Sequence, residues 1–108
     1  MAVLIVFSTF PDTVSARKAA GRLVEAGAAA CASILPGVSS IYRWQGKVEE
    51  SSEALMMIKT TQDAYPRIES TLRGCHPYEL PEILAVRADA GLPGYLQWVV
   101  EATARNNE

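Results

Sequence analysis

Apolar positions at the start of the chain follow two different patterns. Residues 2–9 form a continuous apolar run that ends at Pro11-Asp12, which predicts a strand buried on both faces. From Thr13 to Ala26 apolar side chains recur at helical spacing, with Asp12 as the N-cap and Gly27 as the stop. The predicted inward positions of this helix are Ala16, Ala20, Leu23, Val24 and Gly27.

The middle of the chain carries strand patterns. Residues 28–35 are mostly apolar, and a bend at Pro36-Gly37 separates them from residues 38–44, where apolar and polar side chains alternate. Gln45-Gly46 predicts a tight turn, after which Lys47 begins the partner strand of a hairpin. Residues 53–60 then predict a central strand with both faces covered.

A second helix follows, and its start is constrained by a proline. Thr61 or Asp63 can cap it, and Asp63 is favoured because Pro66 is tolerated only in the first turn. Gly74 is expected to end the helix. Its predicted inward positions are Ile68 and Leu72.

The remaining segments complete a recognisable element order. Residues 82–89 predict a fourth strand, and Pro93 lies in the first turn of a last helix. The packing stripe of that helix is Tyr95, Leu96, Val99, Val100 and Thr103, and residues 105–108 are expected to fray. The order is a doubled βαβ unit with a hairpin arm and an added C-terminal helix. It predicts an α+β fold, a ferredoxin-like βαββαβ sandwich with the helices on one face of an antiparallel sheet.

Composition narrows the classes of function. The 108 residues predict a single domain, 1–108, and 49% hydrophobic with 20% charged residues is ordinary for a soluble protein. A formal charge of −2 argues against nucleic-acid binding. The first apolar run is too short to span a membrane and lacks a basic start, and two cysteines are too few for a disulfide scaffold. We therefore expect a cytoplasmic protein with no membrane partner.

Candidate chemistry concentrates in residues 74–84. They hold His76, which is the only histidine of the chain, next to Cys75, and then Glu79 and Glu82. Imidazole, thiolate and carboxylate groups bind transition metals, so His76 and Glu79 are predicted metal ligands. The alternative for His76 is an interaction with free carbonyl groups at the end of a helix. Glu82 is expected to be a solvated or interface carboxylate, because residues three apart in an extended segment point to opposite faces.

Several short segments, in this order, carry a resemblance to a known family. They are Ser8-Thr-Phe-Pro-Asp12, Ala29-Ala-Cys-Ala-Ser33, Pro36-Gly-Val-Ser-Ser-Ile-Tyr-Arg-Trp-Gln-Gly-Lys47, Ile58-Lys-Thr60, His76-Pro-Tyr-Glu-Leu-Pro-Glu-Ile83 and Tyr95-Leu96-x-Trp98. They are distributed over essentially the whole chain, which resembles the CutA divalent-ion tolerance family. One departure is Ser8, where some members of that family carry a cysteine, so a metal site that relies on that thiol would lack it.

The resemblance implies a ferredoxin-like protomer in a tight cytoplasmic homotrimer, built like the PII signalling proteins. In such a trimer the long second and third strands pair with neighbouring subunits. It also implies a link to divalent-metal tolerance and metal binding, copper above all, without a settled reaction. The expected cofactor is therefore Cu(II) or another divalent metal and no other group, and a further protein partner is left open.

The other candidate residues each have two interpretations. Cys31 is the third predicted metal ligand, since a thiolate suits Cu(I), but an ordinary core thiol is the favoured interpretation. Tyr42 and Trp44 share one face of the hairpin arm and predict a trimer contact or a ligand-stacking surface. Lys59 is either a solvated strand end or a contact for an anion. Trp98 lies off the stripe of its helix and is expected at an interface or groove.

Three functions compete. The first is a trimeric metal-binding protein of metal tolerance. The second is a PII-like sensor that binds a small anionic ligand in the cleft between subunits. The third, an enzyme, is not expected, because the chain has no second histidine to act as a base and no Gly-rich phosphate loop after a strand, and no catalytic residue is assigned.

Overall fold

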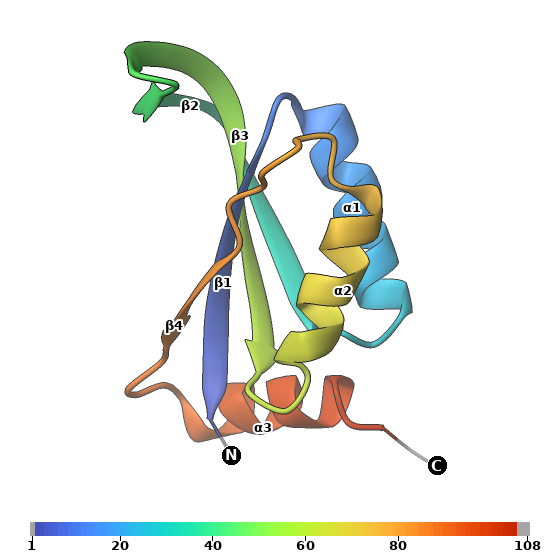
Figure 1. Ribbon diagram of the computed structural model, residues 1–108. Coiled ribbons are helices and arrows are strands. Elements are labelled where there is room, and N and C mark those ends of the chain that lie inside the picture. The colour runs from blue at the N-terminus through green and yellow to red at the C-terminus, as the bar shows by residue number, and fades with distance from the viewer. Residues whose placement is uncertain (1, 106–108) are drawn as a thin grey trace.

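The computed structural model describes residues 2–105, which form a four-stranded sheet and three helices (Figure 1). The elements are β1 (Val3–Phe10), α1 (Thr13–Glu25), β2 (Cys31–Trp44), β3 (Lys47–Thr61), α2 (Tyr65–Cys75), β4 (Leu84–Arg87) and α3 (Pro93–Ala102). The strand order is β2-β3-β1-β4, and all three pairs are antiparallel. The predicted α+β ferredoxin-like arrangement is confirmed. None of the helices within residues 2–105 is long and apolar enough to cross a membrane.

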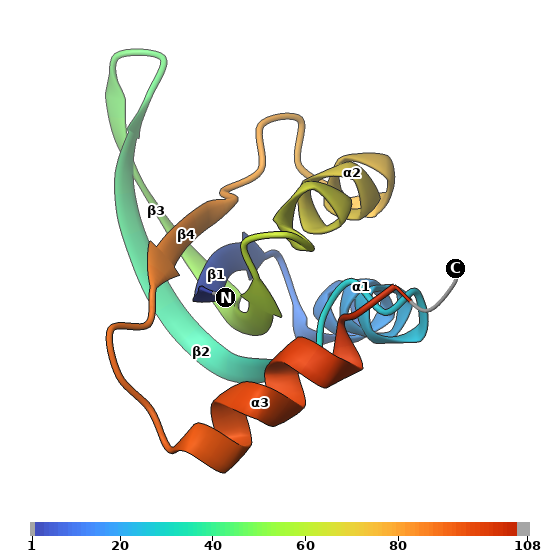
Figure 2. The same ribbon diagram turned by 90° about the horizontal axis from the view of Figure 1, so that it is seen from below.

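The core lies between the sheet and the helices α1 and α2, which cover the same face (Figures 1 and 2). Alternate residues of β1 and β3 point into it, because side chains along a strand alternate between the two faces. The fully buried members from these two strands are Val6, Phe10, Met56 and Ile58. They pack with Ala16, Ala19, Ala20 and Leu23 of α1 and with Ile68 and Leu72 of α2.

Within residues 2–105 no helix covers the opposite face of the sheet, and we call it the open face. It carries Ile5, Phe7, Leu35, Leu55, Met57, Leu84 and Val86. Leu84 and Val86 are 63% and 48% exposed, and Met57 is half-buried. The prediction that the strands at residues 2–9 and 53–60 are covered on both faces is therefore wrong for the single chain. The apolar runs supplied side chains for both faces, but the helices cover only one.

The strands β2 and β3 extend beyond the rest of the sheet as a hairpin arm, residues 38–53 (Figure 1). Gln45 and Gly46 at its tip have φ angles of 50° and 81°, which confirms the predicted tight turn. The predicted bend at Pro36-Gly37 is a register shift inside one continuous strand, with Gly37 at a φ of 72°. The arm can thus curve without interrupting its pairing.

Several element ends differ from the prediction. Helix α2 begins at Tyr65 with Pro66 in its first turn, and it continues through Cys75 rather than ending at Gly74. The fourth strand is only Leu84–Arg87, because it pairs with β1 alone at the edge of the sheet. On α1, Val24 is 45% exposed, and Ala19 takes the inward position instead.

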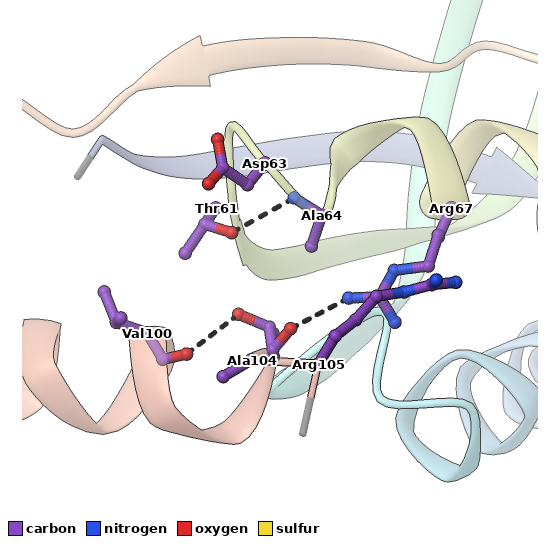
Figure 3. A pocket seen from close by; sticks show the side chains of 8 residues that line it. Thr61, Asp63, Ala64, Arg67, Val100, Ala104 and Arg105 are labelled. Carbon is purple, nitrogen blue, oxygen red and sulfur yellow. Dashed lines mark hydrogen bonds between the residues drawn. The ribbon is translucent and has the colours of Figure 1, made fainter. Parts of the chain in front are cut away.

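Helix α3 lies across the end of the sheet where β1 begins and β3 ends (Figure 1). Val99 is fully buried and Thr103 is 4% exposed, as the packing stripe predicted, but Tyr95 is 42% exposed. A hollow of about 420 Å³ separates α3 from the start of α2 (Figure 3). Arg67 reaches across it and donates hydrogen bonds to the carbonyl oxygens of Thr103 at 2.8 Å and Ala26 at 3.3 Å. One guanidinium therefore binds the carboxyl-terminal ends of both α1 and α3.

Candidate functional site

A groove of about 590 Å³ lies between the hairpin arm and the segment that follows α2. It lies at one end of the open face. Its lining residues are Thr9 of β1, Ser40, Ile41, Tyr42 and Trp44 of β2, Ser51 and Glu53 of β3, and Tyr78, Glu79, Leu80 and Glu82. Its volume is in the range of small-molecule sites.

The segment that forms one wall of the groove is held to the sheet by His76. This residue caps the end of α2, and its ring stacks on Phe10 with the ring centres 4.1 Å apart. The Nε2 atom lies 3.0 Å from the carbonyl oxygen of Thr9, and Nδ1 accepts a hydrogen bond from the backbone N–H of Tyr78 at 3.1 Å. Because Nδ1 accepts, the ring is neutral and Nε2 carries the proton.

The protonation of His76 follows from its surroundings. Burial lowers its pKa below the ordinary value, while the carbonyl of Thr9 and the charge of Glu53 act in the opposite direction. Both ring nitrogens are occupied by hydrogen bonds within the chain. The residue therefore positions the backbone, and a metal could take one nitrogen only if one of these bonds were released.

Glu53 and Tyr78 form the innermost polar contact of the groove. Glu53 is 8% exposed, and its Oε2 atom accepts a hydrogen bond of 2.6 Å from the hydroxyl of Tyr78. Burial raises the pKa of Tyr78 well above its usual value, and the hydrogen bond to Glu53 and the charge of that carboxylate raise it further. The phenol thus remains a donor, and a carboxylate that would otherwise be buried without a partner is satisfied on one oxygen.

The outer walls are aromatic and acidic. The hydroxyl groups of Tyr42 and Ser51 lie 2.8 Å apart, and Trp44 is 44% exposed at the mouth of the groove. Glu79 and Glu82 are exposed, and with Glu53 they give the lining three carboxylates. No lysine or arginine is among its described lining residues. Such a site attracts cations and repels anions.

The structure brings some of the predicted residues together. Glu79, Tyr42 and Trp44 line the groove, and His76 lies directly behind its wall. Glu79 and Glu82 were expected to point to opposite faces, but both line the groove. The reason is that residues 77–80 bend, so the alternation of an extended strand does not apply to them.

Other predicted residues lie elsewhere. Cys31 and Lys59 are paired across β2 and β3, roughly 20 Å along β3 from Glu53 at the usual rise per residue. The Nζ atom of Lys59 lies 2.7 Å from the hydroxyl of Ser33 and 3.9 Å from the thiol of Cys31, so Cys31 does not join His76 within one chain. Trp98 is 44% exposed on α3, with its ring 5.6 Å from that of Tyr95.

Within residues 2–105, no group of three or more His, Cys, Asp or Glu side chains is placed to hold a metal ion. The predicted ligands His76, Glu79 and Cys31 therefore do not form a centre in the single chain. The oxygen atoms that a cation could reach in the groove belong to Glu53, Glu79 and Glu82.

Glu53 and Tyr78 were not singled out from the sequence. Tyr78 lies inside the segment with the histidine, but nothing in the pattern pairs it with a strand 25 residues away. The only available signal was a glutamate at the start of an apolar run, opposite Val38 of the partner strand. A charged residue at such a position indicates either a strand end or a site.

Comparison with known proteins supports a family assignment. Residues 4–102 match the family described as CutA1 divalent ion tolerance protein. The divalent-cation tolerance protein CutA of Thermus thermophilus is 44% identical over 99 residues, which are 92% of this chain and 96% of that protein. The mouse Protein CutA is 43% identical over 97 residues, but this chain spans only 55% of its length.

Solved structures agree. The divalent cation tolerance protein of Thermus thermophilus has a TM-score of 0.92 at 43% identity, over 94% of this chain and 99% of that one. CutA1 from Oryza sativa also has a TM-score of 0.92, at 31% identity, over 99% of this chain and 97% of that one. The chain belongs to the CutA1 divalent ion tolerance family.

Proposed function

We propose that this protein contributes to divalent-cation tolerance, copper included, by binding the cation as a cytoplasmic homotrimer through the acidic groove. The observation that carries the proposal is the lining of that groove, with three carboxylates and no basic side chain among the described residues. A site of this charge concentrates cations from solution. No catalytic step is part of the proposal.

The choice of metal depends on His76. Carboxylate oxygens suit hard divalent cations, whereas Cu(II) binds more strongly when an imidazole nitrogen is present. Copper binding in the groove would therefore require His76 to exchange one of its two hydrogen bonds for the metal. Since the groove carboxylates do not form a close cluster, we propose that a neighbouring subunit supplies the remaining ligands.

The homotrimer is proposed from the open face and the arm. Leu84 and Val86 expose large apolar side chains on a sheet face without a helix, and Ile41 and Val48 are 70% and 68% exposed on the arm. Apolar surface of this kind is normally covered in an assembly. Light scattering during gel filtration should give about 35 kDa, three times the 11.7 kDa of one chain. A mass of one chain would contradict the trimer.

Metal binding is tested by titrating the purified protein with Cu(II) against a competing chelator. We expect saturable binding that Glu79→Gln weakens, because this change removes a charge from the rim without altering its size. Glu25→Gln removes an exposed charge at the end of α1, outside the groove lining, and should have no effect. Equal effects of the two substitutions, or no saturable binding, would refute the proposed site. His76→Ala measures whether copper recruits the imidazole.

A sensor of a small anionic molecule is the second candidate, favoured by the half-buried ammonium group of Lys59 on the open face. The anionic ligand expected from the sequence would not suit the groove, because the carboxylates of the groove would repel it. Lys59, the expected anion contact, faces Ser33 on a distant part of the open face. An anion-binding sensor therefore needs a cleft formed near Lys59 by a second chain. Loss of phosphate or carboxylate binding in Lys59→Gln, with metal binding retained, would support this candidate.

A further inference from the structure

The groove combines two features that a bare metal site does not need. The rings of Tyr42, Trp44 and Tyr78 line it together with Leu80 and Ile41, so much of its wall is apolar or aromatic. A hydrated divalent ion makes no use of such a wall, because it is bound by oxygen atoms and water. An apolar wall with a few charges is instead typical of sites for organic ligands.

The second feature is the carboxylate of Glu53, which has no positively charged partner within residues 2–105 of its own chain. Glu53 is 8% exposed, and the hydrogen bond that it accepts comes from a neutral phenol. The nearby ring of His76 is also neutral, since Nδ1 accepts a hydrogen bond from a backbone N–H. Among the described residues, the groove lining contains no lysine or arginine. Carboxylates as buried as Glu53 are usually paired with a cation. A ligand with a positive charge could therefore pair with Glu53.

Aromatic rings also attract positively charged groups. An ammonium group over the face of a tryptophan or tyrosine is attracted by the ring quadrupole, and aromatic cages recognise alkylated ammonium groups in this way. Trp44 and Tyr42 are placed on the arm side, and Tyr78 is placed on the opposite wall. The Tyr42 hydroxyl is oriented by Ser51 at 2.8 Å, and the Tyr78 hydroxyl by Glu53 at 2.6 Å. The two tyrosine rings are therefore held by their polar ends.

We propose that the groove binds a small organic cation, with its ammonium group near Glu53 and its apolar body against Tyr42 and Leu80. This goes beyond the proposed function, although it uses the same groove. A divalent metal and an organic ammonium ion would then compete for the carboxylates. The aromatic residues would matter for the ammonium ion alone.

The test uses pentylammonium as the probe, with 1-pentanol and pentanoate as neutral and anionic controls of the same length. The chain has two tryptophans, so Trp98→Phe leaves Trp44 as the only tryptophan reporter. Quenching or enhancement of its fluorescence then reports on the groove. We expect saturable binding of pentylammonium at least tenfold tighter than that of pentanol, and none of pentanoate.

Variants locate the site. Glu53→Gln keeps the size of the side chain and an oxygen acceptor for Tyr78, and it should weaken pentylammonium binding at least tenfold. Glu25→Gln, at the end of α1 and outside the lining, should leave it unchanged. Tyr42→Leu, followed by calorimetry, should weaken pentylammonium binding but not Cu(II) binding.

The outcomes separate the two proposals. Equal binding of pentylammonium and pentanol, no binding, or no effect of Glu53→Gln would overturn the inference. Saturable Cu(II) binding in that situation would leave the proposed metal function intact. Pentylammonium binding without any Cu(II) binding would support the inference and refute the metal function.

Discussion

The hydrogen bond between Tyr78 and Glu53 is predicted to be one of the strongest single contacts that hold the groove together. In Tyr78→Phe the carboxylate of Glu53 remains 8% exposed but loses its 2.6 Å donor. A hydrogen bond to a charged group is worth about 1.5–3 kcal/mol, and leaving the buried acceptor unpaired has a similar effect. We therefore expect Tyr78→Phe to lower the free energy of unfolding by about 2 kcal/mol.

Tyr42→Phe is the matched control. It removes another tyrosine hydroxyl from the same groove, but its partner Ser51 is neutral and the contact is exposed. Its expected loss is about 0.5 kcal/mol, at the low end for a neutral hydrogen bond. Urea unfolding followed by circular dichroism, at one chain concentration because assembly would contribute to stability, measures both variants. Equal losses for the two substitutions would show that the charge and burial of Glu53 add nothing to the contact.

A double-mutant cycle isolates the contact itself. Glu53→Gln removes the charge, and Tyr78→Phe should then be less harmful in that background, with an interaction energy of about 1 kcal/mol or more. The raised pKa of Tyr78 adds a pH dependence. Its stabilising contribution should be complete below pH 10.0, the ordinary value for tyrosine, and should be lost as the pH rises toward the higher pKa of the folded state. Additive effects of the two substitutions would show that Tyr78 and Glu53 do not interact.

Three further predictions concern residues outside the groove lining. Arg67→Ala should lower the free energy of unfolding by about 2 kcal/mol, because it releases carbonyl groups at the ends of α1 and α3. Arg73 is exposed, so Arg73→Ala should change the free energy of unfolding by less than about 0.5 kcal/mol. Similar values for the two variants in urea unfolding would contradict the role of Arg67 in holding the two helix ends. Ser8 is fully buried, and its hydroxyl has no hydrogen-bond partner within residues 2–105, so Ser8→Ala should raise the midpoint of thermal unfolding. A lower midpoint would show that the hydroxyl is satisfied. Burial lowers the pKa of His76, so the unfolded chain takes up a proton first, and the protein should lose stability as the pH falls below 6.5. His76→Gln should lose less stability over the same range. An equal pH dependence of stability in the variant and the parent would contradict the neutral ring.

The sequence predicted the elements well wherever one pattern dominated. Helices α1 and α2 followed from apolar spacing and from Asp12 and Pro66, and the arm followed from the Gln45-Gly46 turn. Prediction from the sequence failed where the burial of a side chain depends on what covers that face of the sheet. A strand with apolar side chains on both faces cannot reveal whether the second face is covered by a helix or left open.

The site was only partly predictable for a related reason. His76 and Glu79 were found because rare and charged residues cluster in a short segment. Glu53 and Tyr78 are 25 residues apart, and the register of β3 together with the bend after α2 decides that they meet. The role of His76 also changed with the structure, because hydrogen bonds to Thr9 and Tyr78 occupy both of its nitrogens.

A crystal structure of the protein grown with Cu(II), with anomalous diffraction recorded at the copper edge, would decide whether the acidic groove is the cation site. We expect an anomalous peak in the groove, within coordination distance of a carboxylate oxygen of Glu53, Glu79 or Glu82. The groove should be bounded there by a neighbouring subunit. A peak at Cys31, or no ordered copper at concentrations that saturate binding in solution, would contradict this assignment.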